Sequence, residues 1–172
     1  LSLILALLIV PTSLLAGLNT AARAETVGSV TGLPIPRYVT LQAEEVNVRT
    51  GPGVRYPVDW VFVRENMPVE IVSEFENWRK VRDFEGTEGW VHQSMLSGRR
   101  SVLVIGRNRT LRRESADSSP AVAHLEPGVI AWLESCAQEW CEIDTGRRVV
   151  ALGAEGARNT RSARSTRTFD PP

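Results

Sequence analysis

The chain is poor in the residues that enzymes use for nucleophilic, acid–base or metal chemistry. Its 172 residues include only two cysteines and two histidines, and neither His92 nor His124 has a cysteine at a spacing typical of a dyad or a zinc site. We interpret both histidines as surface or core residues. No phosphate-binding loop, nucleophile elbow or paired-carboxylate motif is found. We therefore expect no catalytic residue, no metal, no cofactor and no enzymatic activity.

The chain also lacks an excess of charge of either sign. Its 20 basic residues balance 20 acidic ones, so nothing in the net charge indicates a nucleic-acid partner or an anionic surface. Lysine itself is nearly absent, because Lys80 is the only one and the other 19 basic residues are arginines. This bias is typical of a gene rich in G and C.

Long hydrophobic runs are absent except at the start, where residues 1–18 are mostly Leu, Ile, Val and Ala without charge. Ala22-Arg23-Ala24 follows, which predicts a secretory signal peptide over residues 1–24. The alternative is a membrane anchor, but Pro11, Thr12 and Ser13 interrupt a run that is short for a span of about 20 residues. We expect cleavage, no membrane contact afterwards, and a periplasmic or secreted protein.

The rest of the chain has no long stretch with helical periodicity. Residues 25–37 are rich in Gly and Pro and indicate a linker. From Tyr38 onward, short apolar alternations are separated by turn residues, as where Val46 and Val48 alternate with Asn47 and Arg49. Such short strands at close spacing predict an all-β fold of small barrels. Turns are expected at 50–53, 76–77 and 85–89.

The second half of the chain repeats the first at a shift of about 62 residues. Val48-Arg49 corresponds to Leu111-Arg112, and Trp78-Arg79-Lys80-Val81 corresponds to Trp140-Cys141-Glu142-Ile143. A repeat of domain size indicates two copies of one fold. We place the first copy at 38–98 and the second at 99–146.

The first copy carries a series of ordered motifs. They are Val46-Asn47-Val48-Arg49-Thr50-Gly51-Pro52-Gly53, Tyr56-Pro57-Val58, Trp78-Arg79-Lys80-Val81 and Gly89-Trp90-Val91. With these motifs the segment resembles the bacterial SH3 (SH3b) family. We interpret Gly51 and Gly53 as supplying backbone angles that other residues resist. The resemblance implies a small SH3-like barrel that binds rather than catalyses. Many such domains target cell-wall peptidases to peptidoglycan peptides, and others serve as adaptors.

The second copy departs from the family pattern in two places. Residues 113–117 contain no glycine where the first copy has Thr-Gly-Pro-Gly, and no Gly-Trp strand follows Gly146. We therefore expect an incomplete second barrel and a disordered tail over 147–172, where six arginines face only Glu155 and Asp170. The tail is either a genuine arginine-rich segment that binds acidic polymers or the product of a frameshift near Arg148, since a shifted frame there can encode Gly-Trp.

The two cysteines flank a predicted hairpin. Cys136 and Cys141 enclose Ala137-Gln138-Glu139-Trp140, and in an oxidising periplasm such a pair favours a structural disulfide over two free thiols. The matching positions of the first copy are Glu74 and Arg79, whose opposite charges can also face each other across strands.

Aromatic residues make up only 6% of the chain, and those that are candidates for binding lie in the first copy. One interpretation makes Trp78 and Trp90 core or half-buried barrel residues. The other makes Tyr56, together with Trp60 or Trp90, the wall of a shallow groove for a peptide or glycan stem. Nearby arginines can hold a carboxylate unless they are simply solvated. The candidate ligand-binding residues are Tyr56, Trp60, Trp90, Arg49 and Arg55.

Two hypotheses of different class follow. The first is a non-catalytic module of the cell envelope that binds peptidoglycan peptides or a protein partner. The second is a structural envelope protein whose paired barrels dock on each other and hold no small ligand. An open aromatic groove between the two copies favours the first hypothesis, and aromatic rings buried at the contact between them favour the second.

Overall fold

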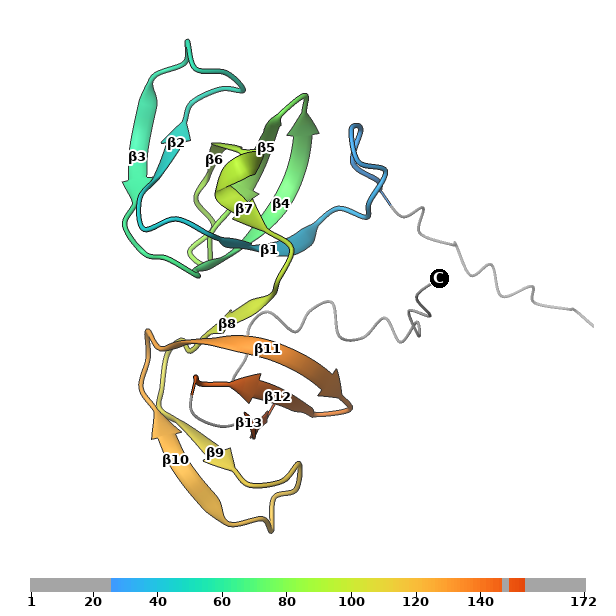
Figure 1. Ribbon diagram of the computed structural model, residues 1–172, viewed down its shortest axis with the longest axis vertical. Coiled ribbons are helices and arrows are strands. Elements are labelled where there is room, and N and C mark those ends of the chain that lie inside the picture. The colour runs from blue at the N-terminus through green and yellow to red at the C-terminus, as the bar shows by residue number, and fades with distance from the viewer. Residues whose placement is uncertain (1–25, 147–148, 154–172) are drawn as a thin grey trace, which may run out of the picture.

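Alternating apolar and polar residues form short strands throughout the part of the chain that the structure, a computed structural model, describes: residues 26–146 and 149–153 (Figure 1). The first domain contains β1 (Arg37–Leu41), β2 (Val46–Arg49), β3 (Val58–Phe62), β4 (Pro68–Phe75), β5 (Trp78–Arg82), β6 (Glu88–His92), the one-turn 3-10 helix η1 (Gln93–Met95) and β7 (Leu96–Ser97). The second contains β8 (Ser101–Leu103), β9 (Arg109–Arg112), β10 (Ala121–Leu125), β11 (Ile130–Ala137), β12 (Trp140–Asp144) and β13 (Val149–Gly153).

The strands assemble into two antiparallel sheets with matching topology. The first has the order β3-β2-β6-β5-β4-β1-β7 and the second has the order β10-β9-β13-β12-β11-β8. Apart from the additional strand β7, each strand of the first sheet has a counterpart at the same place in the second. The predicted all-β fold with SH3-like barrel domains is confirmed. The predicted turn at 76–77 is also present, because the register of β4 with β5 pairs Phe75 with Trp78.

Each sheet encloses its own hydrophobic core. In β2 the buried residues are Val46 and Val48, whereas Asn47 points to solvent, as the alternation predicts. The remaining buried residues of the first core are Val39, Leu41, Phe62, Met67, Val69, Ile71, Val81 and Val91. The second core is formed by Val102, Val104, Leu111, Leu125, Ala131, Leu133, Cys141, Ile143, Val150 and Leu152. Because the cores are separate, the two domains can differ in their surface sites.

The second domain contains the strand that the sequence pattern predicted to be missing. Residues Val149–Gly153 form β13, which pairs with β12 over its whole length and with β9 through Ala151 and Leu152. Ala151 and Leu152 are buried at 3% and 1% exposure. The prediction that no strand follows Gly146 was wrong, because backbone pairing and apolar side chains suffice where Gly-Trp is absent. Because this strand is present, the argument for a frameshift from a missing strand no longer holds. The rest of the predicted tail, 154–172, lies outside the described residues, as does the predicted signal peptide.

The segment predicted to be a linker packs against the first domain. A bridge between Val27 and Pro34 closes a turn, and the amide of Gly28 donates to the carbonyl of Leu33 at 2.8 Å. The turn lies against the end of the hairpin formed by β4 and β5. Among residues 26–146 and 149–153, no helix is long and apolar enough to cross a membrane.

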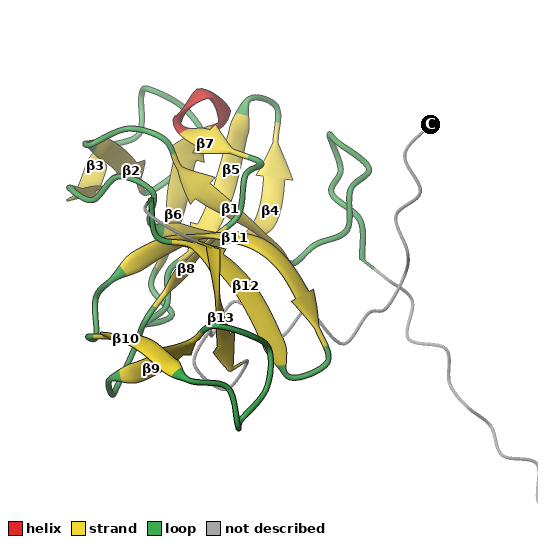
Figure 2. Ribbon diagram, turned by 60° about the horizontal axis from the view of Figure 1, so that its bottom comes forward, coloured by secondary structure: helices red, strands yellow, loops and turns green. Residues whose placement is uncertain are grey.

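β8 follows the first domain and leads into the second (Figures 1 and 2), and small polar side chains of β1 and β8 connect the two domains. The hydroxyls of Thr40 and Ser101 lie 3.0 Å apart and are fully buried, and Ser101 also donates to the carbonyl of Asn66 at 2.7 Å. Ile130 of β11 packs against the core of the first domain. The domain contact is therefore ordered by buried hydrogen bonds rather than by stacked aromatic rings.

Candidate functional site

The loop between β2 and β3, residues 50–57, is held closed by an arginine at the end of β2. Nη1 of Arg49 donates to the carbonyl of Tyr56 at 2.7 Å and to that of Val54 at 3.2 Å. The backbone adds bonds from Thr50 to Pro57 and from Tyr56 to Gly53, both at 3.1 Å. Arg49, predicted to hold a ligand carboxylate, thus shapes the loop.

The glycines of this loop make room for the ring of Tyr56. A Cβ atom on Gly51 would lie 2.4 Å from Cδ1 of Tyr56, and one on Gly53 would lie 3.4 Å from the other side of the ring. Neither glycine has a positive φ. Our interpretation that they supply unusual backbone angles was therefore wrong, and close packing against an aromatic ring is the physical reason for their presence.

The matching loop of the second domain, residues 113–120, closes in the same way without an aromatic ring. Nη1 of Arg112 donates to the carbonyl of Ser119 at 2.7 Å, and the amide of Arg113 donates to Pro120 at 3.1 Å. The amide of Ser119 donates to Ala116 at 3.0 Å. These bonds place Ser119 where the first domain has Tyr56. An arginine thus holds the loop in both domains, whereas the aromatic ring is present only in the first.

Tyr56 presents a half-buried ring beside a solvent-exposed cation. The guanidinium carbon of Arg55 lies 5.4 Å from the centre of the Tyr56 ring. Val54, at the tip of the same loop, is 79% exposed. An aromatic face next to a guanidinium offers both stacking area and a donor for a carboxylate.

Trp60 and Trp90 lie on opposite faces of the sheet. Trp60 pairs with the buried Val48, and its Cη2 would lie 3.1 Å from a Cβ on Gly89, so it covers the edge of the core. Trp90 pairs instead with Arg49 and Lys80 on the outer face. The five predicted ligand-binding residues thus do not form one groove. Tyr56 and Trp90 are neighbours of Arg49, Arg55 lies beside Tyr56, and Trp60 is on the opposite face.

The outer face beyond Trp90 is covered by ion pairs. Lys80 lies 2.6 Å from Glu88, and Arg82 lies 2.7 Å from Glu70 and 3.7 Å from Glu88. The hydrogen bond from Lys80 lowers the pKa of Glu88, and the hydrogen bond to Glu70 raises the pKa of Arg82. The two sides of Trp90 therefore differ, with the ion pairs on one side and the loop of Tyr56 on the other.

Glu74, expected from the sequence only to face Arg79 across strands, is a buried carboxylate. Its side chain is fully buried and accepts from the amides of Val30 at 3.0 Å and Thr31 at 2.9 Å. Arg37 donates to it at 2.6 Å, and Nε of Arg79 lies 3.6 Å away. Burial alone would raise its pKa, but these donors, with the amide of Thr31 first, hold it at about 2, below the ordinary 4.5.

The second domain has a disulfide at the matching position. Cys136 and Cys141 are register partners on β11 and β12 and are joined by a bond of 2.07 Å, just as Glu74 and Arg79 are partners on β4 and β5. One hairpin end is thus closed by ion pairing and the other by a covalent bond. The repeat at a shift of about 62 residues aligns Glu74 with Cys136, and this alignment is the sequence signal that marks Glu74. Nothing in the sequence indicates that the amides of Val30 and Thr31 bind its carboxylate.

The histidines both take part in local hydrogen bonds. Nδ1 of His92 lies 2.7 Å from the hydroxyl of Ser94, and its ring stacks edge-to-face on Trp78 at 5.4 Å. Nδ1 of His124 lies 3.3 Å from the hydroxyl of Thr110. Within the described ranges, no three His, Cys, Asp or Glu residues gather in a way that could hold a metal ion.

The fold and the arginine-held loop define a protein with SH3-like domains. Residues 42–98, within the first domain, match the family model for the bacterial SH3 domain. The second domain lies outside that match. No curated protein matches the chain.

A solved structure, that of NlpC2 from Trichomonas vaginalis, is 8% identical to this chain with a TM-score of 0.33. The alignment covers 70% of this chain and 47% of that one, so it spans about half of the solved protein.

Proposed function

We propose that this protein is a non-catalytic module of the bacterial cell envelope, outside the cytoplasm, whose first domain binds peptidoglycan peptides at the loop 50–57. The observation that carries the proposal is the ring of Tyr56, seated on Gly51 and flanked by Arg55. Because the second domain closes the same loop with Ser119, the ring is not required for the fold. A ring that the fold does not need and that remains half-exposed is suited to contact a ligand.

The loop is suited to a short, acidic peptide. Arg55 is exposed and can donate two parallel hydrogen bonds to a carboxylate, while the Tyr56 ring packs on an aliphatic stem. Trp90 extends this surface along the outer face because it is the register partner of Arg49. Arg49 already orders the loop, so little conformational entropy would be lost on binding.

The location of these side chains favours binding over a purely structural role. The small cavity of about 200 Å³ at the domain boundary is lined by Glu65, Asn66, Ile130, Ala131, Trp132, Asp144, Thr145 and Gly146. Tyr56, Trp60 and Trp90 are not among the residues that line it. The cavity at the domain boundary therefore does not include the candidate site.

A pull-down on purified peptidoglycan sacculi tests the proposal, using the chain from residue 25 onward. The variant Tyr56→Ser introduces the residue that the second domain has at this position and should keep the loop closed. We expect the wild type to be retained and this variant to lose at least about tenfold in affinity, the effect of about 1.4 kcal/mol of lost aromatic contact.

The matched control is Phe75→Ser, which removes a 49% exposed ring at the turn between β4 and β5, outside loop 50–57, and it should be retained like the wild type. Equal retention of all three proteins would show that the binding site lies outside loop 50–57. Retention of none would favour a protein partner or the structural role.

A further inference from the structure

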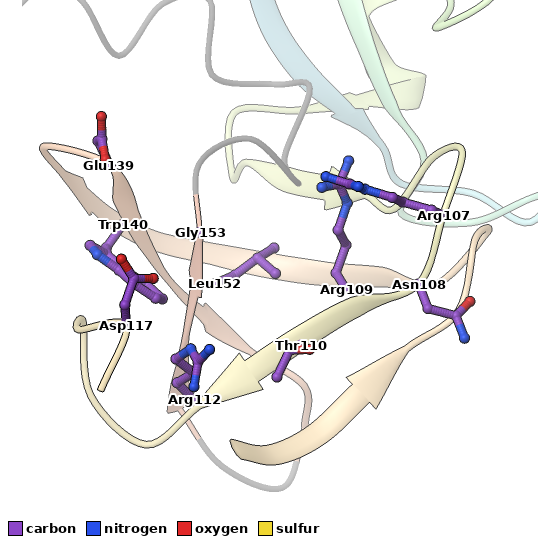
Figure 3. A pocket seen from close by; sticks show the side chains of 10 residues that line it. All are labelled: Arg107, Asn108, Arg109, Thr110, Arg112, Asp117, Glu139, Trp140, Leu152 and Gly153. Carbon is purple, nitrogen blue, oxygen red and sulfur yellow. The ribbon is translucent and has the colours of Figure 1, made fainter. Parts of the chain in front are cut away.

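The second domain has a cavity of its own, on the side where β9 and β13 diverge (Figure 3). Its volume is about 540 Å³. The lining residues are Arg107, Asn108, Arg109, Thr110, Arg112, Asp117, Glu139, Trp140, Leu152 and Gly153. Neither the sequence motifs nor the proposed peptide site accounts for this cavity.

Its charges are divided between two sides. Figure 3 shows the side chains of Arg107 and Arg109 extending to the same side of the cavity, away from Asp117 and Glu139, which lie on the side of Trp140. Among residues 26–146 and 149–153, no carboxylate forms an ion pair with either of these two guanidinium groups, which create a positive potential that attracts anions. The side of the cavity with Arg107 and Arg109 is therefore suited to bind an anion.

Arg109 provides the most specific indication of a ligand. Its Nε atom is buried and has no hydrogen-bond partner among the described residues. Buried donors of this kind are nearly always paired, because losing water without gaining a partner is costly. Arg112 differs from Arg109, because its Nη1 already bonds to the carbonyl of Ser119. The orphaned donor of Arg109 therefore indicates a missing acceptor.

Comparison with the first domain shows how the cavity arises. Leu111 matches Val48, so Arg109, two residues earlier, stands where the first domain has the fully buried Val46. Met95 and Leu96 pack against that core and close it. In the second domain the corresponding place is a polar cavity lined by arginines. An apolar core position has thus become a charged one.

We propose that this cavity binds a small ligand through a carboxylate or phosphate group held by the guanidinium groups of Arg107 and Arg109. Both anions accept paired hydrogen bonds from the planar fork of a guanidinium. Trp140, on the opposite side, offers a face for the remainder of the ligand. This anion site is independent of Tyr56 and would remain if the peptide site were disproved.

NMR titration of the 15N-labelled chain from residue 25 onward tests this site. Sodium phosphate and sodium acetate are added separately, with sodium chloride holding the ionic strength constant. We expect a saturable shift of the Arg109 Nε–Hε signal and of the amides of residues 107–110 at millimolar concentrations. The salt that saturates at the lower concentration identifies phosphate or carboxylate as the preferred group.

Two variants test whether the anion binds in this cavity. Arg109→Gln should weaken binding at least about tenfold, because it removes a charge-assisted hydrogen-bond donor. Arg113→Gln removes an exposed arginine that does not line the cavity and should leave binding unchanged. If Arg109→Gln disturbs the amide pattern of β13, the exposed Arg107→Gln replaces it. Shifts that stay linear for both salts, or equal weakening by the control, would overturn the proposal.

Discussion

Glu74 joins the N-terminal segment to the first domain at the level of single residues. Its carboxylate accepts from the amides of Val30 and Thr31, on a turn that lies outside the family match, and from Arg37 at the start of β1. One ionised group thereby binds two backbone amides and one guanidinium group. The state of the N-terminal segment should therefore depend on the charge of Glu74.

We predict an acid-sensitive contribution to stability from this residue. Because the folded pKa is about 2 and the ordinary value is 4.5, the stabilisation is fully present above pH 4.5 and is lost as the pH falls toward 2. It amounts to about 3 kcal/mol. Urea unfolding across this pH range should show a steep loss in the wild type and a shallower one in Glu74→Gln.

The control for this experiment is Glu85→Gln, which removes an exposed carboxylate in the turn before β6. Its pH dependence should follow that of the wild type. If Glu74→Gln kept the full acid-sensitive loss, another carboxylate would be responsible and the role assigned to Glu74 would be wrong.

Gly89 is the second residue whose substitution should change the free energy of unfolding. A Cβ atom at this position would lie 2.2 Å from Cγ1 of Val48 and 3.1 Å from Trp60, so Gly89→Ala should overpack the core. We expect a loss of about 1–3 kcal/mol. Gly98→Ala, where a Cβ meets nothing within 4 Å, should change stability by less than about 0.5 kcal/mol. Equal urea midpoints for the two variants would contradict this account of the Gly-Trp motif.

The sequence located these glycines but not the reason for all of them. Gly51 and Gly53 suggested special backbone angles, whereas the structure shows the ring of Tyr56 packed against them. A glycine that makes room for a side chain several residues away has the same sequence signature as one that turns the backbone. Only the contacts distinguish the two.

At the level of secondary-structure elements, strand alternation and turn residues predicted the hairpins of both domains. The sequence did not predict β13. Its residues Val150, Ala151 and Leu152 are all buried and show no alternation of apolar and polar residues. A strand buried on both faces does not show the period of two that marks a half-exposed one. The search for a Gly-Trp motif therefore placed the end of the second domain at Gly146, seven residues too early.

The position of β13 in the sheet predicts which truncation the second domain tolerates. β13 lies between β12 and β9, so removing it opens the sheet and exposes Ile143 and Leu111, its cross-strand partners. A chain ending at Gly146 should lose the amide protection of β9 and β12, whereas one ending at Gly153 should keep it. Hydrogen exchange followed by NMR measures this difference. Equal protection in the two chains would show that β13 is dispensable.

For the whole molecule, the structure separates three regions that the sequence could not place relative to one another. The proposed peptide site at Tyr56 and the cavity at Arg109 lie in different domains, and the buried contact of Thr40 with Ser101 joins the two domains. Because each domain has its own core, the two domains can differ in what they bind.

The composition of the candidate site could be predicted only in part. Tyr56, Arg55 and Arg49 are neighbours in the chain, so their proximity follows from the loop that joins β2 to β3. Trp60 and Trp90 depend on register, and an irregularity between Val48 and Arg49 changes which residues of β3 face which side. The sequence therefore identified the aromatic residues but not the faces on which they lie.

The central claim is that the first domain binds wall peptides at the loop 50–57, and NMR titration with a soluble peptidoglycan stem peptide tests it most directly. The account predicts saturable shifts at the amides of Arg55 and Tyr56 and at the indole of Trp90, with little change at Trp78. Shifts centred on Trp78 and His92, or none at saturating peptide, would contradict it.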